Sequence, residues 1–197
     1  MAMGAVALGL ALGSCSNVLE ENNRETYTPE FFSTERGVEG GITALYANLR
    51  NLWGNGYWLI ANEIGTDEYT YGHGGDGNCL PIDLSGNGIL NASNCRADNL
   101  WNYAFPDINT ATGVIENGTK AGVSASLLAE AHFFRAHDYF WLVQTFGGVP
   151  LDLGSGELKF NINATRLSTR NTVPEVYTKA IFPDLKEAVT HLPESPR

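Results

Sequence analysis

The chain has 197 residues, of which 43% are hydrophobic and 11% aromatic, as expected for a folded protein. Its net charge of −10 argues against nucleic acid as a partner, because nucleic acid selects Lys/Arg-rich faces, and equally against an anionic lipid surface. An uncharged ligand is compatible with this charge.

The N-terminus is predicted to be an export signal. Residues 1–14 (MAMGAVALGLALGS) carry no charge and are shorter than the ~20 apolar residues that span a bilayer. The run Leu12-Gly13-Ser14-Cys15 resembles a bacterial lipobox, whose Cys is lipidated and becomes the new N-terminus. No Lys or Arg precedes the apolar run, so we interpret Met1 as a late start. We expect a signal peptide over 1–14, lipidation at Cys15 and a polar tether over 15–26; the alternative is a chance Ala/Gly/Leu-rich N-terminus.

A first helix is predicted to begin near Ser33 or Thr34, where a hydroxyl side chain suits the N-cap. Gly40 and Gly41 weaken its helix propensity but permit a close approach by a neighbouring element. Apolar residues at helical spacing indicate one buried face. These residues are Val38, Ile42, Leu45, Tyr46, Leu49, Leu52 and Trp53.

Residues 54–94 are rich in Gly and lack sustained periodicity, which predicts a long irregular region. Loops of this length are usually functional or disordered. The composition suits sugar binding, because aromatic faces stack on CH groups and polar side chains bind hydroxyl groups. The candidate ligand-binding residues are Tyr69, Tyr71, His73 and Asp76, with Trp101 of the next helix as an outside candidate.

Two cysteines remain once Cys15 is set aside. Cys79 and Cys95 form an even pair in an exported chain. A disulfide between them would contribute on the order of 3 kcal/mol. The alternative is two free thiols.

A second helix is predicted from about Cys95 to Asn117, with a kink or break at Pro106 and a turn at Asn117-Gly118. A third helix is predicted to follow from about Ala121 and to stop at Gly147-Gly148. This third helix carries aromatic residues on two sides, so we expect it to be packed on more than one face. The broad apolar stripe is Ala129, Phe133, Ala136, Tyr139, Phe140, Val143 and Phe146, and Phe134 and Trp141 lie on the second side.

The titratable residues of this helix are predicted to be structural. His132 and His137 are separated by about 140° and cannot share a metal ion from one helix face. Arg135 and Asp138, three residues apart, are expected to pair on the helix surface. We find no motif for nucleophilic or metal-dependent hydrolysis, and predict no catalytic residue, metal or cofactor.

A polar crossing over 153–172 leads to a final helix with apolar residues from Val176 to Leu192 and an internal Pro183. These helix pairs predict an all-α fold of TPR-like helical hairpins with one long irregular region. The run from Glu130 to Leu151, EAHFFRAHDYFWLVQTFGGVPL, resembles a block of SusD/RagB-like proteins. Segments that begin at Asn62 and at Arg166 also resemble that family, whereas Thr112 stands where the family has Asn.

The resemblance implies a bacterial outer-membrane lipoprotein that binds a glycan and delivers it to a TonB-dependent SusC-like transporter. It covers residues 27–197 as the N-terminal, TPR-like part of the family, so we expect this chain to be a fragment. None of the candidate ligand-binding residues matches a family binding motif, and the 54–94 loop faces either a ligand or the transporter. The alternatives are a fragment of a secreted glycan-degrading enzyme and a helical scaffold for protein partners.

Overall fold

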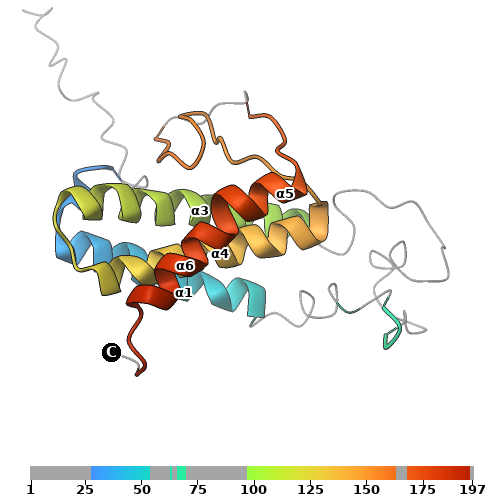
Figure 1. The fold of residues 1–197 in the computed structure, drawn as a ribbon, viewed down its shortest axis with the longest axis horizontal. Helices are drawn as coiled ribbons and strands as arrows, with labels where there is room; N and C mark the ends of the chain where they lie inside the picture. Colours follow the sequence, from blue (N-terminus) through green and yellow to red (C-terminus); the bar gives the residue numbers. More distant parts are fainter. Residues whose placement is uncertain (1–27, 54–62, 64–65, 70–96, 163–167, 196–197) are drawn as a thin grey trace, which may run out of the picture.

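Every named secondary-structure element in the described part of the protein is a helix. A computed structural model describes residues 28–53, 63, 66–69, 97–162 and 168–195 (Figure 1). Within these residues no helix is both long and apolar enough to span a membrane. The elements are η2 (Phe31–Ser33), α1 (Glu35–Trp53), α3 (Ala97–Lys120), α4 (Ala125–Phe146), α5 (Val173–Val176), η5 (Tyr177–Ile181) and α6 (Phe182–His191). The predicted all-α fold is confirmed.

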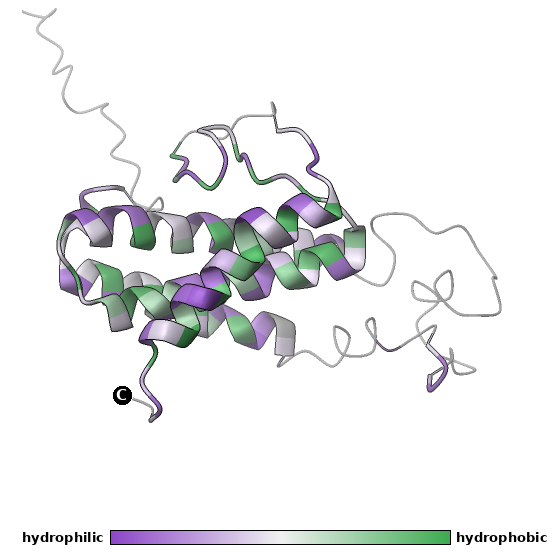
Figure 2. Ribbon diagram, in the orientation of Figure 1, coloured by the Kyte–Doolittle hydropathy of each residue, from purple (hydrophilic) through white to green (hydrophobic). Residues whose placement is uncertain are grey.

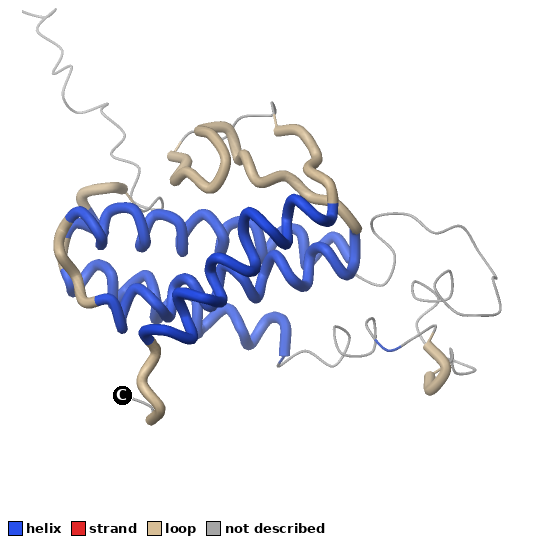
Figure 3. Tube along the Cα trace, viewed as in Figure 1, coloured by secondary structure: helices blue, strands red, loops and turns tan. Residues whose placement is uncertain are grey.

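Helix α4 is the centre of the bundle, as its two-sided aromatic pattern predicts. It packs against α3, α6 and α1. Figure 1 shows α3 and α4 side by side, with α6 crossing them, and Figure 3 shows the loop that precedes α5 lying over α3. Apolar and polar segments alternate along the helices in Figure 2, as expected of amphipathic helices in a bundle.

Two clusters of buried side chains form the core, one along the C-terminal half of α4 and the other along its N-terminal half. One cluster joins α3, α4 and the helical run that begins at Val173, with Leu100, Ile108, Tyr139 and Ile181 among its members. The other joins η2, α1, α3 and α4. Its members are Phe32, Val38, Ile42, Leu45, Ala111, Val114, Leu127, Leu128, Ala131 and Phe134.

Side-chain caps mark the beginnings of α1 and α4. Thr34 caps α1 by accepting a hydrogen bond from the Gly37 N–H at 3.1 Å, as predicted. Helix α4 begins a few residues later than the sequence suggested. Gly122, with φ of 73°, follows the end of α3, and Ser124 caps α4 by accepting from the Leu127 N–H at 3.3 Å.

The predicted turn at Asn117-Gly118 is wrong, because both residues lie inside α3. The Asn117 side chain donates to the carbonyl of Gly113 at 3.0 Å, which satisfies its amide within the helix. Gly118 lets a neighbouring helix approach, since a Cβ there would lie 2.7 Å from Cδ2 of Leu128. This pair of residues serves close packing instead of chain reversal.

Of the kink or break predicted at Pro106, the break does not occur, since α3 is continuous from Ala97 to Lys120. Pro106 and Asn102 are both exposed, so the carbonyl that the proline leaves without an N–H partner can bond to water. Pro183 is accommodated differently. It lies at the start of α6, directly after the π-helical segment η5, where the Phe182 N–H bonds to the carbonyl of Tyr177.

A buried ion pair fastens α6 to α4. Nε and one terminal nitrogen of Arg135 donate to the two carboxylate oxygens of Asp184 at 2.7 and 2.8 Å. Nδ1 of His132 lies 2.7 Å from Oδ1 of Asp184, and Arg135 also donates to the Thr112 hydroxyl of α3 at 3.2 Å. The expected surface pair of Arg135 with Asp138 is therefore wrong: both residues are buried and have other partners.

Hydrogen bonding decides the ionisation of Asp184. Burial by itself raises the pKa of this carboxyl, but the bonds from Arg135 and His132 outweigh burial and hold the pKa below its usual 3.8. A carboxyl group whose pKa is lower in the folded than in the unfolded chain stabilises the fold at any pH above the unfolded-chain pKa. This stabilisation is lost as the pH falls through the pKa of the folded chain. The Arg135–Asp184 pair is thus intact at neutral pH.

Gly41 explains the close approach of α1 to α3. A Cβ at this position would lie 2.7 Å from both Cε1 of Phe32 and Cγ2 of Val114, two buried side chains. At Gly40 a Cβ would meet only Phe31, at 3.2 Å from Cζ, the outer end of an exposed ring. The two adjacent glycines therefore differ in what surrounds them.

We predict that Gly41→Ala lowers the free energy of unfolding by about 1–3 kcal/mol, because the core must shift to admit the methyl group. The matched control Gly40→Ala raises it by about 0.5–1 kcal/mol through better helix propensity. Urea denaturation of both variants measures the difference. Equal effects of the two substitutions would show that α1 and α3 are not in close contact at Gly41.

Candidate functional site

The structure describes two of the candidate ligand-binding residues, Tyr69 and Trp101. Tyr71, His73 and Asp76 lie outside the described residues, as do Cys15 and the cysteine pair Cys79 and Cys95. The ligand, lipidation and disulfide predictions for these residues stay predictions.

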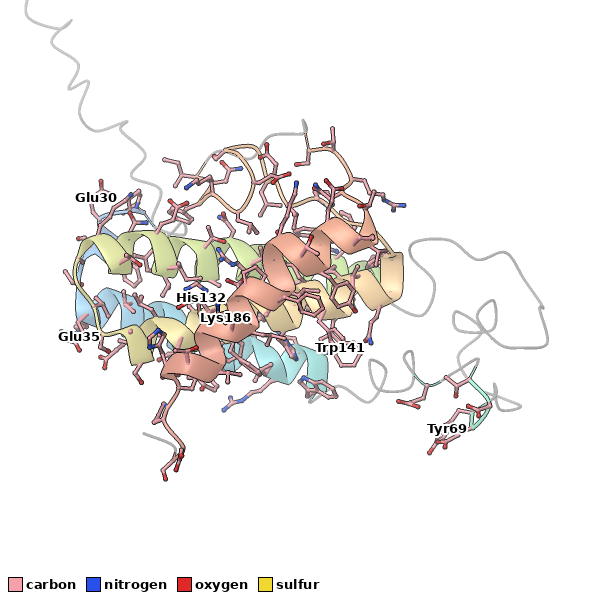
Figure 4. All side chains as sticks on the ribbon, in the orientation of Figure 1. Glu30, Glu35, Tyr69, His132, Trp141 and Lys186 are labelled. Carbon is pink, nitrogen blue, oxygen red and sulfur yellow. The ribbon has the colours of Figure 1, made fainter. Side chains whose placement is uncertain are left out.

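Tyr69 has the exposure expected of a binding residue. It is 56% exposed and Figure 4 shows it away from the helices. A short turn precedes it, in which the Thr66 hydroxyl donates to the carbonyl of Glu63 at 2.8 Å. Trp101 lies elsewhere, on α3, with its ring 4.6 Å from Phe105 and 5.3 Å from Phe146 of α4. The ring of Trp101 thus contributes to helix packing.

Sequence reasoning missed an aromatic face on α1 and α4, formed by Tyr46, Trp53, Phe133 and Phe140. These side chains are 51%, 49%, 40% and 38% exposed. Helical periodicity assigned all of them to buried stripes, and this assignment is wrong. The period shows which residues share a side of a helix, but it does not show how far a neighbouring helix covers that side.

Ring contacts connect this aromatic face to the core. Tyr46 meets buried Phe134 edge to face at 4.7 Å, and Phe133 meets the same ring at 5.6 Å. Trp53 lies 5.1 Å from Trp141, which Figure 4 shows at the far end of α4. Edge-to-face geometry at these distances is favourable. The exposed rings are thus held in fixed positions.

Polar groups lie beneath the aromatic face. The indole N–H of Trp141 donates to Nε2 of His137 at 3.1 Å, and Nδ1 of His137 lies 3.1 Å from Oδ1 of Asp138. Burial raises the pKa of Asp138 to about 6, although the bond from His137 lowers it. Burial and the charge of Asp138 raise the pKa of Asp107 to about 7, against a hydrogen bond from Asn48.

No group of three or more His, Cys, Asp or Glu side chains among the described residues is placed to hold a metal ion. His132 and His137 have separate partners, Asp184 and Asp138. Asp138 is only 2% exposed, so a substrate cannot reach it without a rearrangement of the core. The described surface therefore offers exposed aromatic side chains for binding.

Comparison with known proteins identifies the family of the chain. A protein-family model described as "Starch-binding associating with outer membrane" matches residues 20–197. The chain belongs to this SusD-like family. The prediction made from the residue order of Glu130–Leu151 is confirmed, and the resemblance extends over most of the chain.

Two SusD-like relatives are similar to this chain over most of its length. SusD-like protein P2 of Formosa agariphila is 30% identical over 205 residues, which cover 96% of this chain and 37% of that protein. A crystal structure of a SusD-like protein from Bacteroides fragilis matches with a TM-score of 0.63 and 22% identity, over 87% of this chain and 32% of that one. At this identity the likeness shows the fold alone. The chain spans about a third of the length of these SusD-like relatives.

Tyr69 and Trp101 can be distinguished by stability. We predict that Trp101→Ala lowers the free energy of unfolding by about 2 kcal/mol, because it removes packing between α3 and α4. Tyr69→Ala is expected to change it by less than about 0.5 kcal/mol, as for other exposed side chains. Chemical denaturation of both variants measures this. A stable Trp101→Ala protein would show that the ring is not part of the packing.

Proposed function

We propose that this chain is the N-terminal, ligand-binding part of a cell-surface lipoprotein that captures an oligosaccharide. The protein delivers its ligand to a TonB-dependent SusC-like transporter in the outer membrane. The observation that carries the proposal is the family match over residues 20–197, since that family is described as starch-binding and associated with the outer membrane. Residues 27–197 form the helical body in this proposal.

The chemistry of the chain supports an uncharged saccharide as the ligand. A net charge of −10 gives no attraction to polyanions, whereas sugar binding depends on ring stacking and hydrogen bonds. Exposed Tyr69 and the rigid aromatic face of α1 and α4 offer such stacking surfaces. Tyr71, His73 and Asp76 follow Tyr69 directly in the sequence and complete the proposed site.

The carboxyl groups of Asp107 and Asp138 do not have the exposure that glycan hydrolysis needs. A glycosidase places two carboxyl groups on either side of the scissile bond, open to the substrate. The two that interact here, Asp107 and Asp138, are respectively half-buried and buried. The alternative of a glycan-degrading enzyme therefore gains no support from this pair.

Anchoring through Cys15 completes the proposal. The acyl chains attached to this residue hold the protein at the outer membrane, and residues 15–26 act as a polar spacer. One lipid chain binds a membrane weakly and two or more bind it stably, so a lipidated N-terminal Cys suits a permanent surface location.

Glycan-array screening followed by calorimetry of the chain from Ser16 onward tests the proposal. We expect oligosaccharide binding, weakened about tenfold in Tyr69→Ala, since the loss of one stacking contact is worth about 1.4 kcal/mol. Trp53→Ala shows whether the aromatic face contributes. Phe182→Ala, which removes an exposed ring from α6, is the matched control and should bind as the wild type does.

Three other outcomes contradict the proposal. The absence of binding by the chain would assign ligand capture to regions beyond it. Release of shorter sugars from the ligand would favour the enzyme alternative. Binding to a transporter without any glycan binding would favour the scaffold.

A further inference from the structure

One side of α6 carries a row of exposed apolar side chains, Phe182, Leu185 and Val189, which we call the outer row. These side chains are 59%, 37% and 84% exposed. Val189 is more exposed than any other large apolar side chain among the described residues. Single apolar side chains are ordinary on a protein surface, whereas a contiguous row of them marks an interaction site.

The spacing of the outer row fits a helix as its occupant. The intervals from Phe182 to Leu185 and from Leu185 to Val189 are three and four residues, and Leu192 at the end of α6 adds another three. At 3.6 residues per turn, the three side chains of the outer row lie within an arc of about 60°. Apolar residues at alternating intervals of three and four form a ridge that packs into the groove of a neighbouring helix.

A different side of α6 is already packed. Asp184 and Ala188 are each 2% exposed, and Asp184 forms the ion pair with Arg135 of α4. The outer row lies roughly 100° around the helix from this packed side. Helix α6 therefore has two sides suited to contact, as α4 has, but the described residues cover one of them.

The outer row also distinguishes α6 from a terminal helix. A stack of helices ends in a capping unit whose outer face is polar, because that face meets water. Lys186, Glu187 and Thr190 are exposed on the remaining side of α6 and suit contact with water. The apolar outer row does not, so it calls for cover by another element.

The length of the SusD-like relatives indicates which element this is. The chain covers 37% of the Formosa agariphila protein and 32% of the Bacteroides fragilis protein, so both contain further polypeptide. In the described part, each long helix packs against the one before it: α3 on α1, α4 on α3 and α6 on α4 (Figure 1). Consecutive elements of a fold are usually neighbours in space. The element expected on α6 is therefore the next helix of a longer polypeptide.

We propose that the outer row of α6 is the docking site for a further amphipathic helix of the same polypeptide, which follows α6 in a longer SusD-like protein. This helix presents apolar side chains at intervals of three and four residues to the outer row, and leaves Lys186 and Glu187 in water. The inference rests on the proposed function in one respect, that this chain is the N-terminal part of a longer protein. It does not depend on glycan binding.

Thiol labelling at single cysteines tests the docking site. The chain from Ser16 onward, with Cys79→Ser and Cys95→Ser, is studied alone and as a fusion to the part of SusD-like protein P2 that follows the region similar to this chain. Val189→Cys places a thiol in the outer row. Glu187→Cys, about 160° around the helix on its exposed polar side, is the matched control.

We expect the thiol of Val189→Cys to react at least about tenfold more slowly in the fusion than in the isolated chain, because a buried thiol reacts only when the structure opens locally. The thiol of Glu187→Cys should react at the same rate in both. Adding Phe182→Ala to the fusion should restore much of the reactivity, since it removes the largest side chain of the outer row. In the isolated chain Phe182→Ala should leave the urea midpoint nearly unchanged, as for other exposed side chains.

A synthetic peptide is the second probe, so that the test does not depend on the folding of the fusion. The peptide has leucine at alternating intervals of three and four residues and polar residues elsewhere, and its control has the same composition in scrambled order. We expect the first peptide to slow the labelling of Val189→Cys in the isolated chain, and the scrambled peptide to leave it unchanged.

Equal labelling of Val189→Cys in the isolated chain and in a folded fusion would overturn the inference. If the fusion does not fold, equal effects of the two peptides would overturn it. Protection in the isolated chain that grows with protein concentration would also contradict it, because a second copy of the chain would then cover the outer row. None of these readouts involves a glycan, so a failure of glycan binding would contradict the proposed function and leave the docking site in place.

Discussion

The buried ion pair between Arg135 and Asp184 is the interaction on which the rest of the described structure depends. A guanidinium and a carboxylate removed from water need each other, since either alone would be an uncompensated buried charge. The two-pronged geometry at 2.7 and 2.8 Å admits one relative placement of α4 and α6. His132 also bonds to the carboxylate of Asp184. The Thr112 hydroxyl accepts a further hydrogen bond from Arg135, which connects α3 to the same cluster. This cluster gives three helices one mutual register.

The ion pair fixes one side of α4, and another side of this helix carries exposed aromatic side chains. Phe133 and Phe140 of α4 are exposed, as are Tyr46 and Trp53 of α1. The ring of Tyr46 contacts Phe134, and the ring of Trp53 contacts Trp141. A rigid helix with a fixed aromatic surface suits ligand capture, which needs contacts organised before binding.

Much of this fold could be predicted from the sequence, because its signals are local. Helical periodicity identified each long helix, and Thr34 and the stop at Gly147-Gly148 marked boundaries through backbone hydrogen bonding. The errors come from distant contacts. Arg135 pairs with a residue 49 positions away instead of with Asp138, and Asn117-Gly118 packs inside a helix because Leu128 needs the space. At the candidate site, Tyr69 is exposed, and its role in ligand binding stays a prediction. The aromatic face was missed because burial depends on neighbouring helices.

A double-mutant cycle at Arg135 and Asp184 tests most directly whether one buried pair holds the helices in register. Arg135→Gln and Asp184→Asn should each lower the free energy of unfolding at neutral pH by about 3–5 kcal/mol, since each leaves the partner's charge unpaired. The double variant has no unpaired charge and should cost clearly less than the sum of the two. Single-variant effects that add to within about 0.5 kcal/mol would contradict the account, because additivity means that the two residues do not act as a unit.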